Sequence, residues 1–377
     1  MAVSDFTSGV SGSTMKFQIQ RYVGDYSNEM YTNAKKLSGT AIVGASADLN
    51  TSIEDYIGQA RWYKPLNAVI NVPSVTSSAA GAYTETDTAF YKYAKTVRTH
   101  GAKEVNVQRV ISQEDGLAKI ARDFGETKAQ DEHNSVLETL NGVSAYETSR
   151  GAGIVSFATN ADSGSTGFFV DVNAAGEFGV AADGTTNPNR GLIDTGVVGA
   201  ARGERLFKAM GMAWKDYEAP YYYMVTSPET LADLRAANLV DDTTITEGNL
   251  TFNTIFQGKF RLLLTRTLGA DQSGSANVND GSTKTTFIVK PSAMAMSPLV
   301  VPMPVEMDRS AAAHGGSGTT DIWYRWGYVV HPMGYSWAGA ENAFVATSGV
   351  GGYDQSASWV RSEAGYLNLG ILPIYHA

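Results

Sequence analysis

The chain has 377 residues, no cysteine, 39 glycines and a formal net charge of −9. The lack of cysteine excludes a disulfide-stapled scaffold, a thiolate zinc site and a cysteine nucleophile. The acidic balance argues against a protein whose main task is to grip nucleic acid tightly. Only 18% of the residues are charged and 10% are aromatic, a combination typical of a chain that buries surface against copies of itself. We expect no membrane partner, because the sequence shows neither a signal peptide nor an apolar run of about 18 residues.

The first 60 residues carry scattered aromatic side chains, among them Phe17, Tyr22 and Tyr31, without a clear helical or strand period. We expect an extended arm with one short helix. An arm with exposed aromatic side chains and no core of its own is expected to pack on another surface.

Residues 61–110 predict a long hairpin-like projection. β-type segments are expected at 61–73, 89–97 and 105–111. A loop tip at 74–83, rich in Ser, Ala, Gly and Thr, lies between the first and the second of them. Two long strands without helices cannot bury both of their faces. The projection is therefore expected to lie on another surface.

A long helix is predicted over residues 112–141. Apolar side chains recur with helical spacing from Leu117 to Phe124 and again from Val136 to Val143. Gly142 is interpreted as the stop, and one helix is favoured over two with a break at Gly125. About 30 residues would span about 45 Å.

The middle of the chain predicts a compact α/β unit over residues 195–300, because strand and helix patterns alternate there. Residues 150–195 indicate short strands and wide turns. Ser227 and Pro228 predict the start of a helix. The expected elements are helices at 197–214 and after Ser227, and strands at 221–226, 260–264 and 286–289.

The segment 322–337 is the most distinctive in the chain. Bulky residues occupy both alternating faces, which predicts a strand covered on two sides. We expect His331, within this strand, to be a hydrogen-bonded structural histidine.

A search for catalytic motifs finds no phosphate loop, dinucleotide fingerprint, zinc-protease motif or nucleophile elbow. We expect no enzyme activity, no cofactor and no metal site. The triplet Asp131-Glu132-His133 is dense in polar groups, but adjacent helical positions point about 100° apart, so a solvated helix face is predicted. Asp241 and Asp242 are interpreted as a turn or helix stop.

Charge is distributed unevenly along the chain. Residues 61–110 carry seven basic and three acidic side chains, a net +4, and residues 111–147 carry three basic and eight acidic, a net −5. An ordinary mixed surface would also fit. Our hypothesis is that the projection of one subunit lies across the acidic helix of the next, where complementary charge sets register. The candidate interface residues are Arg61, Lys64, Lys92, Lys95 and Arg98 on the projection, and Asp123, Glu126, Asp131 and Glu132 on the helix.

Three segments carry a resemblance to a known family. They are LETLNGVSA at 137–145, MVTSPETLADL at 224–234 and WGYVVHPMGYSW at 326–337. With the order of arm, projection, long helix, α/β unit and late aromatic strand, they resemble the major capsid proteins of tailed bacteriophages, which share the Hong Kong 97-like fold.

The resemblance implies an α+β fold with five parts. They are an N-terminal arm at 1–60, an extended E-loop at 61–110, a peripheral domain at 111–195 with its spine helix at 112–141, an axial domain at 196–299, and a return to the peripheral domain at 300–377. It also implies a structural protein that self-assembles as hexamers and pentamers into an icosahedral head around double-stranded DNA. The implied location is the virion head, assembled in the host cytoplasm. The implied partners are copies of itself, a scaffolding protein, a portal, a decoration protein and packaged DNA bound without sequence specificity.

Other readings stay open at this point. An encapsulin-like compartment shell would keep the fold and change the cargo, and a β-rich glycan-binding adhesin would belong to a different class. The long helix and the lack of repeats argue against the adhesin. An unrecognised hydrolase has no motif in its favour.

Overall fold

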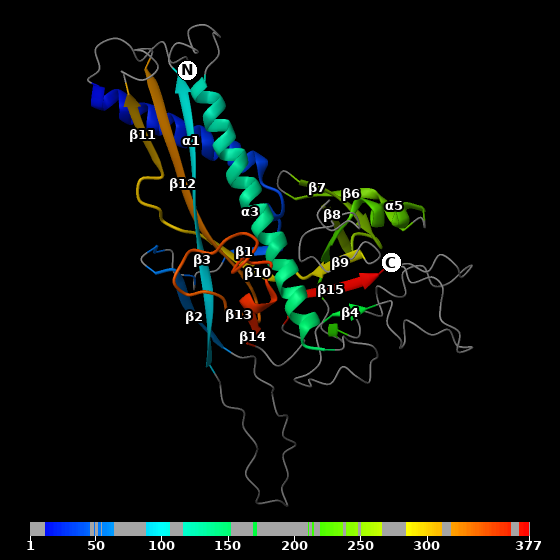
Figure 1. Ribbon diagram of the computed structural model, residues 1–377. Coiled ribbons are helices and arrows are strands. Elements are labelled where there is room, and N and C mark those ends of the chain that lie inside the picture. The colour runs from blue at the N-terminus through cyan, green and yellow to red at the C-terminus, as the bar shows by residue number, and fades with distance from the viewer. Residues whose placement is uncertain are drawn as a thin grey trace, which may run out of the picture.

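The computed structural model describes residues 12–45, 49, 52–53, 55–63, 88–105, 116–151, 169–171, 210, 213–214, 219–236, 239–247, 250–265, 284–310, 318–362 and 369–376. They form an α+β architecture in which one long helix, α3 (Gly116–Ser149), connects two sheets. Figure 1 shows an elongated sheet standing beside this helix and a second sheet packed near its lower half.

Helix α3 is a single element of 34 residues. Leu117, Ala121 and Phe124 are buried on the face that the helical spacing selects. The preference for one helix over two is confirmed, because α3 continues through Gly125. A Cβ at that position would lie 2.8 Å from the backbone nitrogen of Tyr31, so Gly125 serves the close approach of a second helix.

The predicted end of this helix was wrong. Gly142 lies inside α3, which continues to Ser149. A Cβ at Gly142 would overlap the carbonyl oxygen of Tyr353 and lie 2.7 Å from Nε1 of Trp359. The glycine therefore lets the C-terminal part of the chain lie directly on the helix, and it does not stop the helix.

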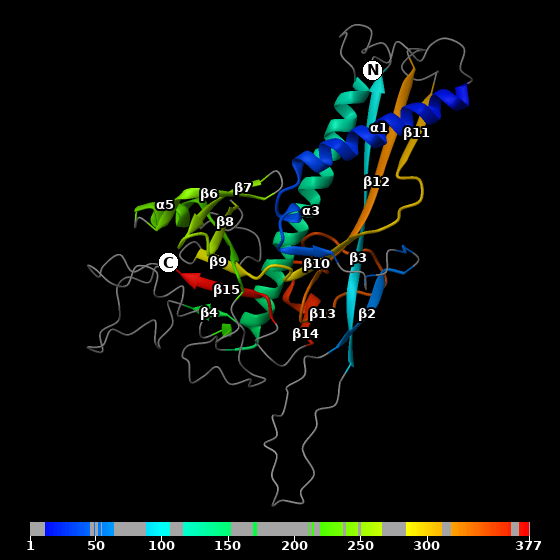
Figure 2. The same cartoon turned by 180° about the vertical axis from the view of Figure 1, so that it is seen from behind.

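The second helix that crosses α3 is α1 (Gly12–Ala34), and Figure 2 shows the crossing from behind. Its 23 residues correct the expectation of an extended arm with one short helix. Val23 is fully buried, and Ile19, Tyr22 and Tyr26 pack against the same cluster. These positions follow the helical spacing i, i+3, i+4 and i+7, so α1 uses one apolar stripe to cover α3.

The elongated sheet has six strands in the order β1-β10-β12-β3-β2, and β11 pairs with β12. Strand β3 pairs antiparallel with both β2 and β12. Its 18 residues include the expected segment 89–97 and continue to Val105, and the rest of the expected segment 105–111 lies outside the described residues. The bounds are β1 (Val43–Ala45), β2 (Ile57–Tyr63), β3 (Thr88–Val105), β10 (Met294–Pro298), β11 (Val305–Ser310) and β12 (Thr319–Pro332).

The aromatic segment is two strands and not one. β12 ends at Pro332, and after a turn in which Gly334 has φ +87° the chain continues as β13 (Tyr335–Trp337), which pairs with β14 (Trp359–Arg361). The second half of β12 is buried throughout, as predicted. In the first half only one face is covered, because Trp323 remains 46% exposed while its neighbours Ile322 and Tyr324 are buried.

The second sheet has seven strands in the order β4-β15-β9-β5-β8-β7-β6. The predicted strands at 221–226, 260–264 and 286–289 are confirmed here. Strand β5 is buried at every residue because both of its faces contact a hydrophobic cluster. The bounds are β4 (Val170–Asp171), β5 (Tyr222–Thr226), β6 (Val240–Glu247), β7 (Leu250–Ile255), β8 (Phe260–Leu264), β9 (Lys284–Val289) and β15 (Ile371–His376).

Smaller elements complete this region. Helix α5 (Pro228–Ala236) begins where Ser227 predicts, since Oγ of Ser227 accepts a hydrogen bond from the backbone nitrogen of Thr230 at 3.3 Å. Asp241 lies in β6 and not in a turn. Two short 3-10 helices are η2 (Leu37–Gly39) and η5 (Ser356–Ser358).

Some expectations fall outside the described residues. They are the loop tip at 74–83, most of the region 150–195 and most of the helix at 197–214. The predicted return of 300–377 to the peripheral part does not include strand β15. This strand joins the seven-stranded sheet, which is formed mainly by strands from residues 196–299. Among the described helices, none is long and apolar enough to cross a membrane.

Candidate functional site

The basic residues of the predicted interface differ in their exposure. Lys95 is 0% exposed and donates from Nζ to the carbonyl oxygen of Ser52 at 2.7 Å. Lys92 is partly exposed and pairs with Glu341 at 2.6 Å. The side chain of Arg61 in β2, like residue Lys64, lies outside the described part. Among the three described basic side chains of the predicted interface, Lys92 is the most exposed, because Lys95 is buried and the side chain of Arg98 is 23% exposed.

The acidic residues divide in the same way. The side chains of Asp123 and Glu126 are 59% and 50% exposed, with His100 at 3.6 Å and Arg122 at 2.7 Å as their respective partners. Asp131 is largely buried, and Glu132 is fully buried. Both of these contact groups of their own chain.

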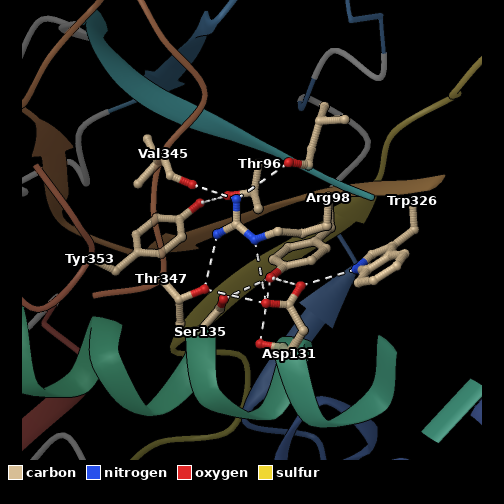
Figure 3. Close-up of polar contacts among 10 residues, drawn as sticks. Thr96, Arg98, Asp131, Ser135, Trp326, Val345, Thr347 and Tyr353 are labelled. Carbon is tan, nitrogen blue, oxygen red and sulfur yellow. Dashed lines mark hydrogen bonds and ion pairs between the residues drawn. The ribbon is translucent and has the colours of Figure 1, made fainter. Parts of the chain in front are cut away.

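Asp131 is the centre of a network that we call the Asp131 junction, formed with Arg98, Trp326, Tyr328 and Thr347 (Figure 3). Oδ2 of Asp131 accepts hydrogen bonds from Nε1 of Trp326 at 3.0 Å and from the hydroxyl of Tyr328 at 2.7 Å. Oδ1 accepts from Thr347 at 3.3 Å and lies 3.5 Å from Nε of Arg98. One carboxylate on α3 therefore connects β3, β12 and the segment after β13.

Arg98 extends the junction toward the C-terminal segment. Its guanidinium donates to the carbonyl oxygen of Val345 and to Oγ1 of Thr347, both at 2.9 Å. The planar guanidinium suits such fixed, multiple contacts better than an ammonium does. Beside it, the hydroxyls of Thr96 and Tyr353 share a hydrogen bond of 2.7 Å, and burial raises the pKa of Tyr353 to about 12.

Burial also raises the pKa of Tyr328, with the nearby Asp131 carboxylate acting in the same direction. The hydroxyl thus stays protonated as a donor to Asp131. Because the junction is partly withdrawn from water, removing Asp131 or Arg98 leaves the other charge without its ionic partner, and this costs about 3–5 kcal/mol in comparable buried pairs.

Glu132 holds helix α1 on α3. The hydroxyl of Tyr31 donates to its carboxylate at 2.6 Å, and the Lys128 ammonium lies 3.9 Å from the centre of the Tyr31 ring. Burial raises the pKa of Glu132, while the Tyr31 hydrogen bond and the charge of Lys128 oppose the rise. The contact is polar at its centre and surrounded by apolar helix faces.

The prediction of a solvated face for the triplet Asp131-Glu132-His133 was wrong. Asp131 contacts the sheet, Glu132 contacts α1, and His133 is buried with 9% exposure. The expectation that the three side chains do not converge on one site is confirmed, because they point to different partners. Helical geometry separates adjacent residues, and here each direction meets a packed element.

A polar groove of 760 Å³ lies between α3 and the end of α1. It includes both exposed carboxylates of the predicted interface, Asp123 and Glu126. Two lysine side chains come from Lys35 and Lys36, which directly follow α1. The lining consists of Asn33, Ala34, Lys35, Lys36, Asp123, Glu126, Thr127, Gln130, Asp131, Asn134 and Leu250.

The partners of the buried carboxylates were missed in the sequence. Tyr31 could have been found, since the apolar spacing of Ile19, Tyr22, Val23 and Tyr26 already indicates a helix that would carry it. Trp326, Tyr328 and Thr347 give no such signal. They lie about two hundred residues from Asp131 in the chain. Trp326 and Tyr328 reach it from β12, and Thr347 reaches it from the segment after β13.

No protein-family model and no curated protein matches the chain. Solved structures do match. The chain is similar to the capsid of Ralstonia phage GP4, with 12% identity, a TM-score of 0.49 and coverage of 92% of this chain and 89% of that one. It is similar to the Cyanophage Pam1 capsid asymmetric unit, with 10% identity, a TM-score of 0.48 and coverage of 93% of this chain and 92% of that one. It is also similar to the head structure of Helicobacter pylori bacteriophage KHP40, with 9% identity, a TM-score of 0.46 and coverage of 91% of this chain and 90% of that one. Each of these solved structures is a phage capsid.

Proposed function

We propose that this protein is the major capsid protein of a tailed bacteriophage, with a Hong Kong 97-like fold and no catalytic role. In this proposal α3 is the spine helix, the β2–β3 hairpin is the root of the E-loop, and the sheet around β5 is the axial domain. Copies assemble as hexamers and pentamers into an icosahedral head that encloses double-stranded DNA.

One observation carries the proposal. A single 34-residue helix lies between an elongated sheet with an 18-residue strand and a separate seven-stranded sheet. This layout supports the order of parts that the three sequence segments imply. The segment at 326–337 forms β12 and β13 beside the helix, which fits its proposed place in the peripheral domain.

The proposed contact between subunits uses the exposed charges. Lys92, with Arg61 and Lys64 on the same projection, would meet Asp123 and Glu126 in the polar groove of the next subunit. The intrachain pairs of Lys92, Asp123 and Glu126 are exposed and contribute about 0–1 kcal/mol each. They can therefore be exchanged for contacts between subunits at little cost. Lys95, Arg98, Asp131 and Glu132 hold each subunit together.

The proposal includes further partners in the virion head: a scaffolding protein during assembly in the host cytoplasm, a portal and a decoration protein. Packaged DNA would contact the shell without sequence specificity. A heterologous contact that repeats around a ring closes it, which is how one charged contact per subunit can generate hexamers and pentamers.

The test is electron microscopy of the purified full chain, alone and after co-expression with the neighbouring genes of its source genome. Rings or closed particles are expected, and size-exclusion chromatography should show a species far larger than the 40.2 kDa chain. A protein that stays monomeric in both preparations at high concentration would contradict the proposal.

A further inference from the structure

A second hollow lies where α3 meets the seven-stranded sheet. It has a volume of 350 Å³, within the range of small-molecule pockets. None of the predicted interface residues lines it. The lining consists of Lys36, Leu37, His133, Val225, Leu250, Leu263, Leu264 and Thr265, and we call it the His133 cavity.

Most of the wall is apolar. Five leucine or valine side chains come from η2 and from strands β5, β7 and β8. Leu264 is 44% exposed, so solvent reaches part of this lining. A hydrocarbon group placed here would remove both itself and these side chains from water, at about 25 cal/mol per Å² of apolar surface.

Two ionisable side chains of the lining lie at α3: His133 belongs to the helix, and Lys36 donates a hydrogen bond to Gln130 of the same helix. His133 is buried, and its Nδ1 has no hydrogen-bond partner among the described residues. A buried polar atom without a partner costs about 1–3 kcal/mol and calls for an explanation. A ligand that supplies the missing hydrogen bond would provide one.

Lys36 supplies a positive charge near this ring. Burial lowers the pKa of His133 to about 4, and the Lys36 ammonium acts in the same direction. The histidine is therefore uncharged at neutral pH, while the lysine carries the charge. Its ammonium is exposed and makes a single long hydrogen bond of 3.3 Å to Gln130, so it is able to turn toward a ligand.

We propose that the His133 cavity binds a small amphipathic carboxylic acid. Its carboxylate accepts hydrogen bonds from the Lys36 ammonium and from a ring N–H of His133, and its hydrocarbon tail lies on the leucine and valine side chains. One cation beside mostly apolar walls suits a singly charged head group. An amine is disfavoured, because Lys36, the charged side chain among the described lining residues, would repel it.

The probe is octanoate, titrated into the full-length unassembled chain by isothermal titration calorimetry. We expect saturable binding with one site per chain. Lys36→Gln removes the charged donor and should weaken binding about tenfold or more. Lys35→Gln is the matched control, because Lys35 lines the polar groove and not this cavity, and it should keep the affinity of the unaltered chain.

Two further ligands and one variant complete the test. Acetate and octyltrimethylammonium are expected not to bind, because the first lacks the tail and the second carries the wrong charge. His133→Leu should weaken octanoate binding while the chain keeps its circular dichroism spectrum. Equal octanoate affinity in Lys36→Gln and the unaltered chain, equally tight binding of octyltrimethylammonium, or no octanoate binding would each overturn the proposal. None of these outcomes depends on shell assembly, so they do not bear on the proposed function.

Discussion

At the scale of single residues, the buried charges of this protein act inside one chain. Asp131 accepts three hydrogen bonds and makes an ion pair with Arg98, with partners from three parts of the chain. Glu132 accepts a hydrogen bond from Tyr31. The charge pattern of the sequence does not distinguish such buried carboxylates from exposed ones such as Asp123. The spacing of residues along a helix predicts in which direction a side chain points, but it does not predict which element packs against that side of the helix.

The Asp131 junction leads to a first prediction. Asp131→Ala would remove the acceptor of Trp326, one hydrogen bond of Tyr328 and the carboxylate paired with Arg98. The free energy of unfolding should fall by about 3–5 kcal/mol. Urea unfolding of the unassembled chain measures this. Asp123→Ala changes an exposed carboxylate on the same helix and should stay within about 0.5 kcal/mol. Similar losses in both variants would contradict the role given to the junction.

His331 leads to a prediction about pH. The ring is buried, stacks on Tyr91 with centroids 4.6 Å apart, and burial lowers its pKa from 6.5 to about 3. Between these values the unfolded chain binds a proton that the folded chain does not. The free energy of unfolding should therefore fall by about 1.4 kcal/mol for each pH unit below 6.5 on account of this residue.

His331→Phe keeps an aromatic ring for the stack and removes the titrating group. Its loss of stability between pH 6.5 and pH 4.5 should be smaller than that of the unaltered chain, as measured by urea unfolding at each pH. An identical loss in the two proteins would show that the acid sensitivity comes from other groups.

At the scale of elements, replacing a glycine within a helix by alanine should have opposite effects on stability at two positions. Gly142 admits the backbone at Tyr353, whereas a Cβ at Gly24 in α1 would meet only Val305 at an ordinary 3.6 Å. Gly142→Ala should destabilise the protein by about 1–3 kcal/mol through overpacking. Gly24→Ala should stabilise it by up to about 1 kcal/mol, the difference in helix propensity.

Thermal unfolding of the two variants checks this pair. The expected result is a lower melting temperature for Gly142→Ala and an equal or higher one for Gly24→Ala. If Gly142→Ala melts at or above the temperature of the unaltered chain, the C-terminal segment does not lie on α3 as described.

The elements differ in how far the sequence predicts them. β8 and the start of α5 were predicted closely, because an apolar run and a Ser-Pro cap are local signals. The predicted end of α3 was wrong. In the sequence, Gly142, which makes room for the carbonyl of Tyr353, looks the same as a glycine that stops a helix. The candidate site was predicted only in its exposed part, Lys92, Asp123 and Glu126, and its use between subunits stays a prediction.

At the scale of the whole molecule, the proposed contact between subunits predicts the outcome of a charge swap. Asp123→Lys with Glu126→Lys should reduce assembly into rings or particles, because the groove would then repel the projection. Adding Lys92→Glu to that double variant should restore part of it. Light scattering during assembly and electron microscopy give the yield.

The control for this experiment makes the same change of charge on another helix. Asp25→Lys with Glu29→Lys alters two exposed residues of α1 and should leave assembly near its original yield. If the control is as defective as the groove variant, or if Lys92→Glu gives no rescue, net charge and not this contact governs assembly.

The place of β15 in its sheet has a consequence for how the protein is made. β15 follows every other strand of that sheet in the chain, yet it lies between β4 and β9 in space, and all six of its residues are buried. While the ribosome is still translating the preceding segments, β9 has an unpaired edge and the adjoining core stays open to water. An exposed edge of this kind invites pairing with other chains. Aggregation during synthesis should therefore increase with the time for which β9 lacks its partner β15. Chaperones that cover this edge should reduce it, and slower translation just before residue 371 should increase it.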